Sequence, residues 1–147
     1  MSAEENKKLV RQIGQAWNET AGDLSKVRAY YEKYSGPGYV HHSLTKGDQN
    51  AEQRIQDVLM SVPAIPDLTY ALDDLVAEGD KVVVRYTARA THKGAFMGIP
   101  ATGKQWVAKG VVIYRLAGGK IVESWEFIDA LGILAQLGVM PARPAPK

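Results

Sequence analysis

The amino-acid sequence changes its hydrophobic periodicity near the middle, and this change limits the folds that the chain can adopt. Before Pro63 and Pro66, apolar side chains such as Leu9 and Ile13 recur at helical spacing. After them, apolar and polar side chains alternate, most clearly over residues 81–91. Helices followed by an antiparallel meander are typical of the α+β class. We expect N-terminal helices to pack on a strongly curved, mostly antiparallel sheet that forms a cone, with a ligand pocket inside.

Local signals divide the chain into a single domain over residues 1–140 and a flexible, Pro-rich tail over residues 141–147. Ser2 and Glu5 resemble a capping box at the start of the first helix. The expected helices cover residues 3–19, 24–34 and 47–62, with a loop through 39–42, and a short helix follows the last strand. The expected strands cover residues 67–76, 81–91, 105–116 and 120–128.

Composition excludes several classes of function. The 147 residues contain no cysteine, so neither a disulfide nor a thiolate metal site is available. A net charge of +2 with interspersed signs gives no basic patch for nucleic acid. The sequence has no apolar run near the length of a membrane span, and its N-terminus has no apolar signal core. We therefore expect a cytoplasmic protein that binds neither nucleic acid nor membranes.

The last expected strand ends in a carboxylate with two possible roles. If the strand alternates regularly, Ile121, Trp125, Phe127 and Asp129 share one face. A carboxylate at the end of an aromatic stripe could be desolvated and act in proton transfer. Asp129 also precedes a helical pattern, where aspartate is a common N-cap. The sequence leaves both roles open.

Several segments, in this order and spacing, resemble the SnoaL-like polyketide cyclase family, which has the cone-shaped fold of the nuclear transport factor two-like superfamily. They are Leu75-Val-Ala-Glu-Gly-Asp-Lys-Val-Val-Val-Arg85, the loop Thr91 to Lys104, Gly119-Lys-Ile-Val-Glu-Ser-Trp125, Asp129, and Leu131 to Gly138. The resemblance covers roughly residues 5–138.

The resemblance implies a cofactor-independent intramolecular aldol condensation that closes a ring in a polyketide-derived carbonyl compound. It implies that Asp129 is the acid/base, and that His42 is the histidine of a matched Tyr-Val-x-His element. It also implies that Arg85 and His92 line or rim the cavity. Strand alternation, however, places Arg85 opposite the apolar set, where it would form a surface ion pair instead.

The expected substrate is a small apolar or aromatic carbonyl compound, held by a wall of large side chains. The residues expected to bind it, besides Arg85 and His92, are Trp17, Tyr34, Met97, Tyr114, Trp125 and Phe127. No metal site is expected, because the adjacent His41 and His42 lack a third ligand at suitable spacing.

The sequence leaves other functions open. An epoxide hydrolase needs two carboxylates bridged by an arginine, and Thr87 stands where the strand of Arg85 would need an acid. The sequence is also compatible with an isomerase and with a non-catalytic binding protein for small apolar ligands. We also expect a homodimer with back-to-back sheets, because the predicted outer face is apolar. The residues assigned to that face are Val83, Val111, Ile113, Val122 and Ile128.

Overall fold

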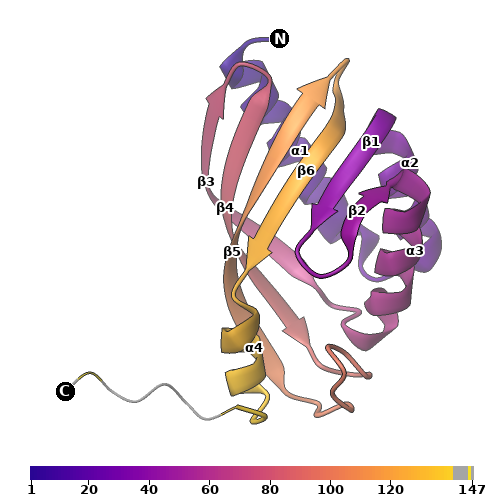
Figure 1. Cartoon of the computed structure of the whole chain (residues 1–147), viewed down its shortest axis with the longest axis vertical. Coiled ribbons are helices and arrows are strands. Elements are labelled where there is room, and N and C mark those ends of the chain that lie inside the picture. Colours follow the sequence, from indigo (N-terminus) through magenta and orange to yellow (C-terminus); the bar gives the residue numbers. More distant parts are fainter. Residues whose placement is uncertain (141–145, 147) are drawn as a thin grey trace.

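A computed structural model of the chain describes residues 1–140 and Pro146, and it confirms the expected α+β class. The predicted flexible tail, apart from Pro146, lies outside the described residues. Helix α1 lies behind one long curved sheet, α2 and α3 lie beside its strands β1 and β2, and a short helix follows its last strand (Figure 1). The helices are α1 (Ala3–Thr20), α2 (Leu24–Tyr34), α3 (Ala51–Ser61) and α4 (Ala130–Gln136), with a 3-10 turn at Val62–Ala64. The strands are β1 (Ser35–Ser43), β2 (Gly47–Asn50), β3 (Thr69–Glu78), β4 (Lys81–Thr91), β5 (Gln105–Ala117) and β6 (Lys120–Ile128).

Helix α1 begins at the predicted capping box. The Ser2 side chain accepts a hydrogen bond from the Glu5 backbone, and the Glu5 carboxylate accepts one from the Ser2 backbone. Both bonds satisfy amides that would otherwise lack partners at a helix N-terminus. Val10, Ile13 and Trp17 then face the sheet at intervals of three and four residues.

The sheet has the strand order β2-β1-β6-β5-β4-β3. All neighbouring pairs are antiparallel except β1 and β6, which are parallel. The predicted loop over residues 39–42 is wrong, since this segment belongs to β1. The predicted third helix is also too long, because β2 takes its first residues and α3 starts at Ala51.

One irregularity in β6 decides which side chains point inward. Arg115 of β5 pairs with Glu123, but the next residue, Leu116, pairs with Ile121. Val122 is therefore an extra residue, and the inward and outward positions exchange across this bulge. Beyond the bulge, Ser124, Glu126 and Ile128 line the interior, and the intervening residues point away from it.

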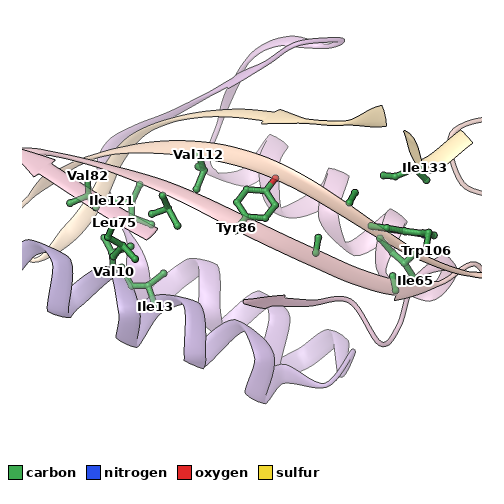
Figure 2. Packing of buried hydrophobic residues seen from close by; sticks show 14 of the residues in the cluster. Val10, Ile13, Ile65, Leu75, Val82, Tyr86, Trp106, Val112, Ile121 and Ile133 are labelled. Carbon is green, nitrogen blue, oxygen red and sulfur yellow. The ribbon is translucent and has the colours of Figure 1, made fainter. Parts of the chain in front are cut away.

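The hydrophobic core lies between α1 and the concave face of the sheet (Figure 2). Alternate residues of β4, including Val82, Val84, Tyr86 and Ala88, are almost fully buried, as the sequence pattern predicts. Within the described part of the chain, no helix has the length and apolar character needed to cross a membrane.

Candidate functional site

A cavity of about 440 Å³ opens between the helices and the concave face of the sheet, beside the core. This volume lies in the range of sites for small molecules. Most of its wall is aromatic or aliphatic, and its polar groups gather in two clusters. The aromatic lining residues are Trp17, Tyr30, Tyr31, Tyr34, Tyr39, Tyr70, Tyr86, Phe96, Trp106 and Tyr114.

The first polar cluster is centred on Glu126 of β6. The Tyr86 hydroxyl donates a hydrogen bond of 2.9 Å to its carboxylate. The guanidinium of Arg54 lies 3.7 Å from Glu126 and 3.7 Å from Asp57, so it bridges two carboxylates that both line the cavity. Asp57 also forms an ion pair with Lys46. Burial disfavours the charge on Arg54, but the surrounding groups, Glu126 among them, raise its pKa, and Arg54 therefore stays cationic.

The second cluster joins β1 to β6 through three side chains. Ser124 Oγ lies 2.8 Å from Nδ1 of His41 and 3.2 Å from the Tyr39 hydroxyl. Burial, together with the smaller effects of the nearby Arg54 and His42, lowers the pKa of His41 to about 4, while Asp57 opposes the shift. The His41 ring is therefore neutral at pH 7.

The tyrosines of the wall are held in their protonated form. Burial raises the pKa of Tyr31 to about 12, and it raises the pKa values of Tyr30, Tyr70 and Tyr114 as well. Protonated hydroxyls can donate hydrogen bonds to oxygens of a ligand. An apolar ring system bearing oxygen substituents is the ligand chemistry that this wall fits best.

Four residues predicted to bind substrate lie in the cavity wall. They are Trp17 of α1, Tyr34 of α2, Met97 of the β4–β5 loop and Tyr114 of β5. Trp17 is fixed by a hydrogen bond of 3.1 Å from its indole nitrogen to the Leu68 carbonyl. Met97 adopts a left-handed backbone (φ 54°) at the tip of the loop, and 41% of its surface is exposed.

The predicted placement of His42, Trp125 and Phe127 is wrong, because all three lie on the convex face of the sheet. His42 stacks on Trp125 with ring centroids 4.9 Å apart, and it bonds to Asp48 at 2.7 Å and to Glu123 at 2.6 Å. These two carboxylates raise the pKa of His42. Its neighbour His41 is the histidine that lines the cavity.

Asp129 does not lie in an apolar hollow, which corrects the placement inferred from its sequence. Its side chain is exposed and accepts a hydrogen bond of 2.9 Å from the Gly132 amide. It is the N-cap of α4, the other role that the sequence allowed. Ile128 and Ala130 on either side of it do line the cavity.

Arg85 and His92 also lie away from the cavity surface. Arg85 is exposed on the convex face, 3.8 Å from Asp73, as strand alternation predicts. His92 is fully buried behind the β4–β5 loop, where its Nδ1 lies 2.9 Å from Thr102 Oγ1 and accepts a bond from the Thr102 amide. It holds the base of the loop that brings Met97 to the cavity mouth.

Sequence reasoning missed Glu126, Arg54 and His41. The sequence did hold a signal for Glu126. Counting by twos backward from the strand end at Ile128 puts Ile128, Glu126 and Ser124 on one face. Arg54 gave none, since an arginine on an amphipathic helix normally faces solvent. In the part of the chain that the structure describes, no group of three histidine or acidic residues is arranged to hold a metal ion.

Comparison with known proteins places this geometry in a family. The model of the SnoaL-like polyketide cyclase family matches residues 7–137. The aklanonic acid methyl ester cyclase DnrD of Streptomyces peucetius is 28% identical over 139 residues, covering 88% of each chain. The structure of AclR from Streptomyces galilaeus, proposed to be a hydroxylase, has a TM-score of 0.82 and 33% identity over 97% of this chain and 91% of its own. That of IdmH from Streptomyces antibioticus, proposed to be a polyketide cyclase, has a TM-score of 0.73 and 29% identity over 91% of this chain and 99% of its own.

Proposed function

This chain belongs to the SnoaL-like polyketide cyclase family, and we propose that it closes a ring in a polyketide-derived carbonyl substrate by cofactor-independent aldol chemistry with Glu126 as acid and base. The observation that carries the proposal is the position of Glu126. Its carboxylate lies in an aromatic cavity, between the Tyr86 hydroxyl and the Arg54 guanidinium. The curated relative DnrD acts on an aklanonic acid methyl ester, which is consistent with a substrate of this class.

In the proposed reaction, Glu126 removes a proton from the carbon between two carbonyl groups. The resulting enolate carbon attacks a second carbonyl of the same molecule, so that a carbon–carbon bond forms and an alkoxide appears. The proton on Glu126 then passes to the alkoxide, which restores the carboxylate. One group serves in both steps, and no other reactant is consumed.

The rest of the cavity supports both steps. Arg54 supplies a fixed positive charge beside the place where negative charge moves between Glu126 and substrate. The aromatic wall, including Trp17 and Tyr114, can hold a flexible chain folded so that its two ends meet.

Replacement of Glu126 by glutamine tests the proposal, with Asp129→Asn as the matched control. Both changes remove one carboxylate charge at nearly constant shape, one inside the cavity and one outside it. The assay follows exchange of the α-hydrogen of methyl benzoylacetate, an aromatic β-keto ester, in deuterated water. We expect E126Q to lose enzyme-dependent exchange by a factor of about 10² to 10⁴, and D129N to keep it.

The opposite pattern, with exchange lost in D129N and retained in E126Q, would restore the role that the sequence suggested for Asp129. If the wild-type protein binds the ester and does not accelerate exchange, the domain is a binding protein for small apolar ligands.

The bridge between Asp57 and Glu126 favours one second candidate, hydrolysis of an epoxide. Two carboxylates joined by Arg54 could activate a water molecule from one side and protonate the opening ring oxygen from the other. Asp57→Asn separates the two candidates. If the protein hydrolyses epoxides, this variant should lose hydrolysis of styrene oxide. If the protein closes rings, the variant should keep exchange of the keto ester within a few-fold of wild type.

We also propose that the protein is a homodimer formed by its convex sheet face. A row of side chains in register crosses this face from Val76 through Val83 and Ile113 to Trp125, and Val76 and Val83 are 61% and 37% exposed. Ile128 faces the cavity instead, and Val122 lies in the bulge. Val83→Glu should convert a dimer to a monomer in sedimentation experiments at micromolar concentration, and a wild-type monomer would contradict the proposal.

A further inference from the structure

The clearest unused chemistry in the cavity is the second polar cluster, which ring closure by Glu126 does not require. His41 is 5% exposed and lines the cavity, so its ring is fixed in place by the wall. Its Nδ1 atom is occupied by Ser124 at 2.8 Å. Its other nitrogen, Nε2, is therefore the ring atom that remains available to a ligand.

Nε2 of His41 has no hydrogen-bond partner among the described residues, yet it is not sealed inside the protein. The described side-chain atoms that are both buried and unpartnered belong to Gln49, His92 and Trp106, and Nε2 of His41 is not one of them. Because the ring lines the cavity and Nδ1 points to Ser124, Nε2 is the atom that opens on the cavity.

Hydrogen-bond direction decides whether this atom donates or accepts. The Tyr39 hydroxyl is buried and lies 3.2 Å from Ser124 Oγ, which in turn lies 2.8 Å from Nδ1 of His41. Each hydroxyl carries one hydrogen, and both hydrogens are bonded within this cluster when Tyr39 donates to Ser124. Ser124 then donates to Nδ1 of His41, and the neutral ring carries its hydrogen on Nε2.

We propose that His41 is a substrate-binding donor, whose Nε2–H bonds to a carbonyl or enolate oxygen of the ligand at the end of a hydrogen-bond chain from Tyr39 through Ser124. The ligand class is thus a planar aromatic compound with an ionisable or enolisable oxygen. The part of this inference that concerns the reaction rests on the proposed function. The direction of the hydrogen bonds at His41 does not depend on it. A neutral donor is suited to such an oxygen, because it stabilises negative charge without surrendering its proton.

Substitutions at position 41 distinguish a donor role from a purely structural one. Glutamine at position 41 can place an amide N–H near the position of Nε2, whereas leucine of similar size cannot donate. His42 offers a matched control, since it is the adjacent histidine and faces the opposite side of the sheet.

The first test is the nitrogen NMR spectrum of the protein labelled with ¹⁵N-histidine at neutral pH. His41 is identified by the signals that disappear in His41→Gln. We expect Nε2 to carry the hydrogen and Nδ1 to be bare. We also expect Ser124→Ala to shift the Nδ1 signal and leave those of His42 in place. A hydrogen on Nδ1 of His41 would overturn the proposal, whether or not Glu126 is catalytic.

The second test is binding of 2-naphthol, an aromatic enol, followed by its fluorescence. We expect His41→Leu to weaken binding about tenfold, the ratio expected for loss of one hydrogen bond. His41→Gln should bind within about threefold of wild type, and His42→Gln should match wild type. Equal binding by the leucine variant would refute the role of His41. If E126Q loses exchange but still binds naphthol, the result supports the role of Glu126 in the reaction and leaves the role of His41 in binding unchanged.

Discussion

His41→Gln should reduce the loss of folding stability that occurs when the pH falls from about 7.5 to 5. The folded-state pKa of His41 is about 4 because the ring is buried beside Arg54, whereas an unfolded histidine titrates near 6.5. Between these values the unfolded chain binds a proton that the folded protein does not. Stability from this group is therefore complete above pH 6.5 and is lost as the pH falls toward 4.

The magnitude follows from the two values. A difference of 6.5 − 4, at about 1.4 kcal/mol per pH unit, gives a limit of about 3 kcal/mol. At pH 5, one unit above the folded-state value, about 2 kcal/mol of this has been lost. The charged groups that act on the ring are Arg54 and Asp57 of α3, on the cavity side, and the adjacent His42, whose side chain lies across the sheet; Ser124 of β6 bonds to Nδ1.

The assay is urea unfolding at several pH values for the wild type, His41→Gln and His42→Gln. Subtracting the glutamine curve removes the titration of carboxylates common to both proteins. The stability of wild type relative to H41Q should fall by about 2 kcal/mol between about pH 7.5 and 5. The opposite trend is expected for His42, because carboxylates raise its folded-state pKa. Its stabilising effect is complete below pH 6.5 and is lost as the pH rises through the raised value.

A difference between wild type and H41Q that does not change with pH would refute the reasoning, because it would mean that His41 titrates alike in both states. Equal slopes for the two histidine variants would mean that the inside and outside positions on β1 have been assigned wrongly.

Three other changes test single contacts. Gly110→Ala should cost about 1 to 3 kcal/mol in urea unfolding and lower the exchange rate, because its Cβ would lie 2.5 Å from the Tyr86 hydroxyl. Asp129→Ala should cost about 1 kcal/mol by removing the bond to the Gly132 amide, and it should leave exchange intact. His92→Ala should cost about 2 kcal/mol and speed proteolysis of the β4–β5 loop, since the buried ring holds the base of that loop. Proteolysis at the wild-type rate would argue against this anchoring role.

The sequence predicts α1 and the four long strands well because their signals are local. Ser2 and Glu5 mark the start of α1, and alternation marks β4. Strand β1 was missed because Ser35-Gly-Pro-Gly38 has the composition of a turn. One partner is β2, which has only four residues, and the other is the parallel strand β6, some eighty residues away, where a pairing leaves no local signal.

The wrong placement of Trp125, Phe127 and Asp129 has a single structural origin in β6. Counting by twos from Ile121, which does face inward, assigns Trp125, Phe127 and Asp129 to the interior. The bulge at Val122 shifts the count by one residue. No sequence signal marks this bulge, because valine is also common in regular strands.

The bulge also explains how one strand serves two different environments. Without it, Glu126 would point to the convex face and an aromatic side chain would enter the cavity. With it, Glu126 and Ser124 lie two positions apart on the concave face, and each contacts a different cluster. Arg54 pairs with Glu126 at 3.7 Å, and after burial its charge is the next cause of the lowered pKa of His41. The carboxylate of Glu126 and the neutral ring of His41 therefore share one neighbouring cation.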